Sequence, residues 1–169
     1  MDSTTLLALE AFPALLEAHY ASIPPEQRHW KPPSWDGIPS EPLTAIEQVC
    51  HVRDIEIEGY QVRLRRVIAE EHPLLPSIDT DAYARDRSYA SADVEAVFAS
   101  FRTARAQTVR FIRDLPPAAF ARSAELEGYG VTTLRGLVHF LCSHDQQHLA
   151  GLQWLLGKME AARSSRSVP

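Results

Sequence analysis

Two histidines, His144 and His148, stand one helical turn apart in the last long helical stretch of the chain. Their positions belong to a stripe that otherwise carries apolar side chains, namely Leu134, Leu137, Val138, Leu141, Leu152, Leu155 and Leu156. Because side chains at i and i+4 lie on the same face of a helix, we expect both imidazoles to face the interior. Buried imidazoles need polar partners, and one divalent metal ion suits two of them. The pair therefore indicates a metal site.

A catalytic zinc-type site commonly has three protein ligands and leaves a position for water or substrate. Among the seven histidines of the chain, His51 lies well inside another helical stretch, beside its apolar stripe. Of the others, His19 lies near a helix end and His29 lies in a proline-rich loop. His72 precedes a proline, and His139 lies on another face of the last helix. Two facing helices that give one and two imidazoles suit the interior of a bundle, so we expect His51 to be the third ligand.

Other metal chemistry fits the spacing less well. A zinc protease helix needs Glu directly after its first histidine, where this chain has Asp145. A carboxylate-bridged di-iron bundle needs Glu-x-x-His on two helices, and this chain has Asp145-x-x-His148. Helical phase turns Cys50 about 100° from His51 and Cys142 about 200° from His144. We therefore expect both cysteines to be buried small side chains rather than thiolate ligands.

Two carboxylates share the helical stretch of His51 and are the candidate catalytic residues, Asp54 and Glu47. Either one is placed to orient a ligand imidazole or to move protons. The alternative is that both are ordinary helix-surface acids, paired with an arginine such as Arg53. Asp145, which follows His144, is expected to point away from the core.

Four stretches with helical periodicity are separated by segments rich in proline, glycine and small polar residues. The expected helices run from about Ser3 to Ser22, Ser40 to Glu71, Ser91 to Leu115, and Thr132 or Thr133 to Ala162. No stretch alternates with the period of a strand. We therefore predict an all-α antiparallel four-helix bundle, as a single domain over residues 1–163 with a disordered tail over 164–169.

The composition suits one globular domain with a sizeable core, since 45% of the 169 residues are hydrophobic and 23% are charged. The net charge of −5 and the lack of a basic stripe give no reason to expect nucleic-acid binding. The apolar runs are too short to span a bilayer, and the first residues lack the pattern of a secretory signal. With two cysteines suited to a reducing compartment, we expect a cytoplasmic enzyme or binding protein.

A set of landmarks, in order along the chain, resembles the DinB-like superfamily. They are the run from Cys50 to Glu56, Pro73 to Pro76 with Asp79, Tyr89, Phe101 to Arg105, Leu115 to Pro117, Thr133 to Arg135, and His144 to Leu149. The similarity spans roughly Trp35 to Leu156. It implies a four-helix bundle with up-down-down-up connectivity, frequent homodimers, and a divalent metal, often zinc or nickel, held by His51, His144 and His148.

Some relatives in this superfamily are thiol-dependent transferases or isomerases that use low-molecular-weight thiols such as bacillithiol or mycothiol. The resemblance therefore implies a metal-dependent thiol S-transferase acting on a small-molecule substrate. Two alternatives stay open from the residues alone: a metal-dependent hydrolase, and a non-catalytic metal-binding bundle with a structural or sensing role. Three imidazoles also suit copper or iron, so the residues do not choose the metal.

Overall fold

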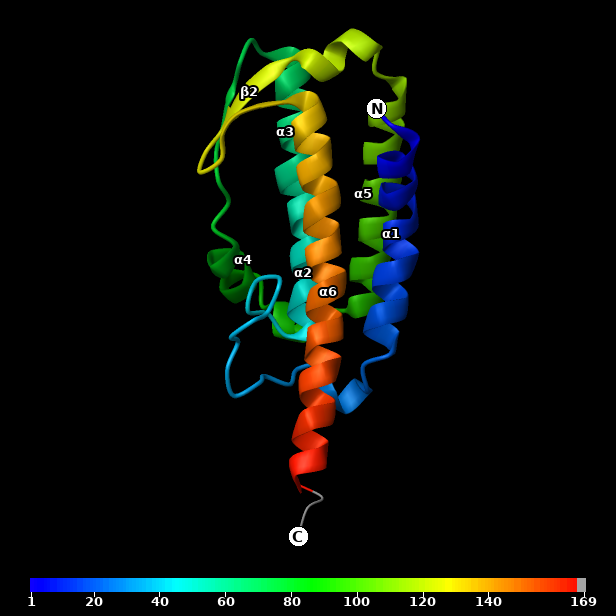
Figure 1. Cartoon of the computed structure of the whole chain (residues 1–169), viewed down its shortest axis with the longest axis vertical. Helices are drawn as coiled ribbons and strands as arrows, with labels where there is room; N and C mark the ends of the chain where they lie inside the picture. The colour runs from blue at the N-terminus through cyan, green and yellow to red at the C-terminus, as the bar shows by residue number, and fades with distance from the viewer. Residues whose placement is uncertain (167–169) are drawn as a thin grey trace.

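The structure is a computed structural model that describes residues 1–166, and four long helical segments lie side by side in it (Figure 1). They are α1 (Ser3–Ala21), α2 (Ala45–Asp54) continued by η2 (Ile55–Tyr60) and α3 (Gln61–Ala69), α5 (Val94–Asp114), and α6 (Leu134–Arg166). Short 3₁₀ segments lie in the connections, at η1 (Pro25–Gln27), η3 (Tyr89–Ser91) and η4 (Pro117–Ala121). The mostly helical fold confirms the predicted class. None of the helices described is long and apolar enough to cross a membrane.

Polar caps set where the helices begin. The Asp2 carboxylate accepts a hydrogen bond from the Thr5 amide at the start of α1, and Asp93 caps α5 in the same way. Thr44 and Glu47 form a capping box at the start of α2. Because this box satisfies the first backbone amides, the helix starts at Ala45, later than the expected start near Ser40.

The last helix is longer than expected. It continues to Arg166, past the end expected near Ala162, so residues 164–166 of the expected disordered tail are helical. Residues 167–169 of that tail lie outside the described residues. In the first helix, Pro13 lies inside α1 and does not divide it.

A π-helical turn, η2, joins α2 to α3 and shifts the buried face. A regular helical period would place Ile57 on the same buried face as Cys50, seven residues earlier, but Ile57 is half-buried, whereas Ile55 and Glu56 are buried. Each turn of a π-helix is closed by an i→i+5 bond and therefore holds more residues than an α-helical turn. The wider turn places Ile55 and Tyr60 on the same side of the segment, where both line one cavity.

A small three-stranded sheet lies at the end of the bundle where α6 begins (Figure 1). Strand β1 (Leu74–Leu75) pairs in parallel with β2 (Ser123–Leu126), which is antiparallel to β3 (Gly130–Thr133). The connection between α3 and α5 also contains a short helix, α4 (Thr80–Asp86). None of these short elements was predicted from the sequence, because strands of two to four residues are too short to show a period.

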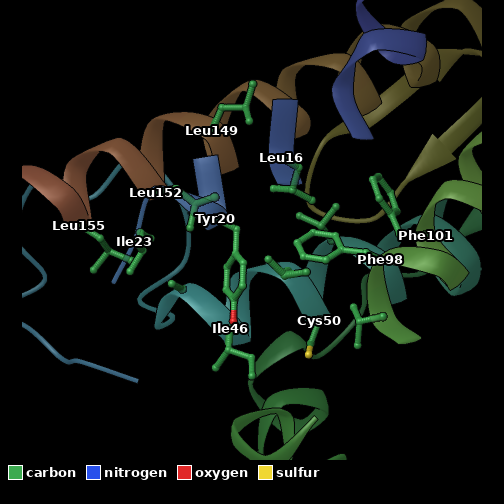
Figure 2. Close-up of a cluster of buried hydrophobic side chains, with 14 of the residues drawn as sticks. Leu16, Tyr20, Ile23, Ile46, Cys50, Phe98, Phe101, Leu149, Leu152 and Leu155 are labelled. Atoms are coloured by element: carbon green, nitrogen blue, oxygen red, sulfur yellow. The ribbon is translucent and has the colours of Figure 1, made fainter. Parts of the chain in front are cut away.

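The bundle has two apolar clusters. Figure 2 shows part of the first, in which side chains from α1, α2, α5 and α6 point toward one another, among them Leu16, Cys50, Phe98 and Leu152. The second cluster includes Leu64, Leu126 and Leu137. Its side chains come mostly from α3, the N-terminal half of α6 and the sheet, with others from α1 and α5. Buried polar residues lie between the two clusters, at His51, Glu56, Arg105, Thr108, Asp145 and His148.

Candidate metal centre

Three imidazoles meet in the polar layer between the two apolar clusters. His51 comes from α2, and His144 and His148 come from one face of α6. The Nε2 atom of His144 lies 3.1 Å from Nε2 of His51 and 3.2 Å from Nε2 of His148. The structure thus brings together all three residues expected to be ligands, with the same ring atom of each turned toward one point.

Glu41 joins this cluster, although it was not among the residues predicted from the sequence. Its carboxylate oxygens lie 3.6 Å from Nε2 of His51 and 3.3 Å from Nε2 of His148. Glu41 belongs to the connection between α1 and α2, which is held against α6 where the rings of Trp35 and Trp154 stack, with centroids 6.2 Å apart. Because this connection has no periodicity, the chain alone offers no signal that Glu41 reaches the histidines.

The donor atoms fit a divalent ion. The ligand atoms of Glu41, His51, His144 and His148 all lie within 4.8 Å of one another. Two nitrogens bound to one zinc ion at about 2.0–2.1 Å, with angles between octahedral and tetrahedral, stand about 2.9–3.4 Å apart. The separations of 3.1 and 3.2 Å between imidazole nitrogens fall in this range. Three neutral imidazole nitrogens suit zinc, nickel and other divalent transition metals, and the Glu41 carboxylate lies beside them.

Burial keeps two of the imidazoles in the form that binds metal. Burial and the neighbouring His148 lower the pKa of His51 to about 4. Burial, with the charges of His148 and His51, also lowers the pKa of His144 well below its usual value. A neutral imidazole has one unprotonated nitrogen, which is the atom that ligates a metal. Both residues are therefore ready to bind at neutral pH without first losing a proton.

Gln48 orients His148. Its Oε1 atom lies 3.1 Å from Nδ1 of His148, so that Nδ1–H donates and Nε2 keeps its lone pair for the metal. Gln48 is itself fully buried and donates from Nε2 to the Leu43 carbonyl oxygen. Gly151, on the next turn of α6, leaves room for it: a Cβ at this position would lie 2.7 Å from Oε1 of Gln48.

The two candidate catalytic carboxylates are engaged elsewhere. Glu47 accepts hydrogen bonds from the backbone and side chain of Thr44, as part of the cap of α2. Asp54 accepts from Arg53, Arg87 and the Tyr89 hydroxyl, which ties α2 to the segment before α5. Neither carboxylate belongs to the cluster that Glu41 and the three imidazoles form.

The cysteine Cys50 also stays out of the metal cluster. Its thiol is buried in the first apolar cluster and donates to the Tyr89 carbonyl oxygen, 3.9 Å away. Burial raises the pKa of Cys50 to about 11, so the thiol is protonated at neutral pH. The structure therefore places Cys50 as the small core side chain that the sequence predicted.

Asp145 is buried, and the expectation that it points away from the core is wrong. Both of its oxygens accept from the guanidinium of Arg105, at 2.6 and 2.9 Å. Arg105 also donates to Glu56, at 2.9 Å, and Thr108 donates to the same carboxylate. The buried arginine supplies the compensating charge that an isolated carboxylate would lack, which is why Asp145 tolerates an interior position.

A cavity of about 380 Å³ opens beside the imidazoles. Its lining includes Glu41, His51 and His144 at one side. The apolar and aromatic part of the wall comes from η2, the α3–α5 connection, the β2–β3 hairpin and α6, at Ile55, Tyr60, Ile78, Leu126, Tyr129 and Phe140. A small organic molecule bound there would lie directly against the candidate metal ligands.

Comparisons with known proteins agree with this description. The structure is similar to that of YfiT from Bacillus subtilis, which is described as a probable metal-dependent hydrolase with an unusual four-helix bundle topology. The TM-score is 0.79 at 19% sequence identity, over 95% of this chain and 90% of that chain, so the likeness shows the fold. A comparison with curated protein sequences gave no match.

The family is identified by sequence as well. The model of the DinB superfamily matches residues 8–152, which contain all four residues of the His/Glu cluster. This match confirms the resemblance drawn from the ordered landmarks. The chain therefore belongs to the DinB superfamily.

Proposed function

We propose that this protein is a metal-dependent enzyme that acts on a small organic molecule bound in the cavity beside His51, His144 and His148. The observation that carries the proposal is the convergence of three imidazole Nε2 atoms beside that cavity, which His51 and His144 line. A purely structural metal site is usually closed by four protein ligands and shielded from solvent, whereas a catalytic site faces a space that substrate can enter.

Each residue has a distinct part in the proposed chemistry. The three imidazoles hold the ion, and Gln48 fixes the ring of His148. A bound divalent ion supplies Lewis acidity, which lowers the pKa of a coordinated water or thiol. Glu41 stands beside the imidazoles as a carboxylate that accepts the proton such a nucleophile releases. The apolar wall keeps the organic part of the substrate out of bulk water.

Two nucleophiles suit this arrangement. Thiol S-transfer, with a low-molecular-weight thiol as cosubstrate and zinc or nickel as the metal, is the reaction that the family resemblance supports. Hydrolysis is the second candidate, because Glu41 is placed to accept a proton from water and because the description of YfiT names a probable metal-dependent hydrolase.

Metal content tests the centre directly. We expect purified protein to carry close to one divalent ion per chain, and His51→Ala and His148→Ala to lose most of it, because each removes one of three imidazole donors. His139→Ala is the matched control, since His139 is exposed on the same helix as His148. Inductively coupled plasma mass spectrometry gives the content, and full retention in the first two variants would contradict the proposal.

Turnover assays separate the candidate reactions. The metal-loaded protein is incubated with alkylating electrophiles plus bacillithiol, mycothiol or glutathione, and separately with esters and amides without thiol. Metal-dependent loss of free thiol supports S-transfer, and metal-dependent hydrolysis without thiol supports the second candidate. A full metal complement with neither activity, together with a large fall in melting temperature on chelation, indicates the structural role instead.

We also propose three further features that the family resemblance implies. These are the up-down-down-up connectivity, a homodimer and a cytoplasmic location. The connectivity is supported by the course of the α3–α5 connection (Figure 1). This connection starts at β1, at the end of the bundle where α6 begins, and returns along the bundle to η3, which contacts α2. The α2–α3 segment and α5 therefore run in the same direction. A dimer is supported by two apolar side chains on α1, Leu7 and Leu15, which are 63% and 42% exposed. Contact with a second copy of the chain would remove their apolar surface from water.

A further inference from the structure

The cavity beside the imidazoles has one cationic side chain in its wall, among the residues that the structure describes. This is Arg63, on α3. The other charged group of the lining, Glu41, is at the imidazole side. Tyr60 links the two sides, because its ring centroid lies 6.0 Å from that of His144 and 5.7 Å from the Arg63 guanidinium carbon. The guanidinium and the candidate metal centre are therefore separated by one aromatic residue.

The guanidinium of Arg63 is positioned but not neutralised. Its Nη2 atom donates to the Pro76 carbonyl oxygen at 2.9 Å, which anchors the side chain to the α3–α5 connection. Within the described part of the chain, no carboxylate lies at ion-pair distance from Arg63. Five N–H donors belong to a guanidinium, so those not used by Pro76 remain for a ligand.

Other arginines of the chain show what a neutralised guanidinium looks like here. Arg87 bonds to Asp54 and Glu58, and Arg105 to Asp145 and Glu56. These partners raise the pKa of both arginines against the effect of burial, whereas burial lowers the pKa of Arg63. A partly buried cation without an anion is costly, and an anionic ligand would remove that cost.

The wall between Arg63 and the imidazoles suits an apolar group. Tyr60 and Ile78 lie next to the guanidinium side, and Leu126, Tyr129 and Phe140 complete the lining. The rings of Tyr129 and Phe140 are in contact, with centroids 5.4 Å apart. Tyr129 is 73% exposed at the tip of the β2–β3 hairpin, so the apolar part of the wall extends to the opening.

We propose that Arg63 is the anchor for a carboxylate on the substrate, and that the site takes organic acids whose apolar body lies along Tyr60 toward the imidazoles. This inference rests on the proposed function, because it concerns the substrate of the same cavity. A guanidinium fits a carboxylate in a bidentate manner, which fixes the orientation of the bound acid as well as its charge. The reactive group of the acid then lies at the opposite side of the cavity, against the candidate metal centre.

Binding of matched acids and amides tests the proposal. We would titrate the full-length protein with 3-phenylpropionate and 4-phenylbutyrate and with the amide of each, by isothermal titration calorimetry. Since a carboxylate also binds a metal ion, each titration is run on protein as purified, after chelation and on His148→Ala. The variants are Arg63→Gln, Arg63→Lys and, as control, Arg65→Gln, because Arg65 is exposed on the same helix and bonds to Gln61 outside the cavity.

We expect the wild-type protein to prefer at least one acid over its amide by about tenfold or more, as a charge-assisted hydrogen bond allows. Arg63→Gln loses this preference, Arg63→Lys keeps part of it, and Arg65→Gln keeps all of it. The preference persists after chelation and in His148→Ala. The role of Arg63 can therefore be confirmed even if the imidazoles turn out to bind no metal. Equal binding of acid and amide by the wild-type protein, an unchanged preference in Arg63→Gln, or no saturable binding of either acid would overturn the proposal.

Discussion

The orientation of one ligand imidazole depends on an amide. The Oε1 atom of Gln48 accepts from Nδ1–H of His148, and Gln48 is fixed in turn by Leu43 and Ser40. A partner of this kind holds both the ring position and the tautomer, and its loss commonly lowers metal affinity by about 10–100-fold. Gly151 matters for the same reason, because a Cβ there would collide with Ser40 and crowd Gln48.

Substitution of two glycines in α6 tests this orientation without removing any ligand. We expect Gly151→Ala to weaken Zn²⁺ binding by about 10–100-fold, because the new methyl group displaces Gln48 from His148. Gly157→Ala is the control: a Cβ there meets nothing within 4 Å, so alanine should leave metal affinity unchanged and favour the helix slightly. Competition with a chromophoric chelator measures both affinities. Equal affinities in the two variants would show that Gln48 does not position the ligand.

At the scale of elements, one buried arginine joins three helical segments. Arg105 on α5 pairs with Glu56 on η2 and Asp145 on α6, and all three side chains are almost completely buried. Asp145 directly follows the expected ligand His144. The cluster therefore fixes α6 against the π-helical turn at the height of the metal centre, although it does not touch a metal ligand through any bond described above.

Arg105→Met should destabilise the protein by about 3–5 kcal/mol, because it leaves two carboxylates in the interior without a counter-charge. Arg102→Met is the matched control on the same helix. Arg102 pairs with Glu17 at the surface, so its loss should cost less than about 1 kcal/mol. Urea unfolding followed by circular dichroism gives both values. Similar losses in the two variants would mean that the buried cluster contributes no more than a surface ion pair.

At the scale of the whole molecule, the metal centre belongs to a polar layer between two apolar clusters. On α6, the cluster toward the sheet ends at Leu141 and the other begins at Leu149, with both ligands of that helix between them. On α5, Arg105 and Thr108 occupy the interval between Phe101 and Val109. A bound ion would thus crosslink the bundle at the height where apolar packing is interrupted.

Chelation should therefore lower the melting temperature. An ion that binds the folded state at 100 times its Kd stabilises by about 2.7 kcal/mol, which for a chain of this length corresponds to about 5–10 °C. Differential scanning calorimetry with and without a strong chelator measures the shift. His148→Ala should melt at a lower temperature and lose most of the response to chelator. A shift of the same size in that variant would show that the stabilising ion binds elsewhere.

Much of the fold follows from local rules that a single chain displays. The apolar stripes predicted the four long helical segments, and His144 and His148 were recognisable because they interrupt one of these stripes. Arg105 interrupts a buried face in the same way, since it stands between Phe101 and Thr108 on α5, but it was not predicted to be a buried residue. The π-helical turn and the short strands gave no comparable signal, because neither produces a regular period.

The sequence by itself determined which residues share a helix face, and hence that two imidazoles point inward together, because helical geometry repeats every few residues. Only the tertiary structure decided that Glu41 joins them, that Glu47 and Asp54 are used elsewhere, and that Asp145 is buried. It also decided that Arg63 faces the same cavity. Each of these depends on contacts between segments far apart in the chain, and such contacts arise from packing rather than from any periodicity along the sequence.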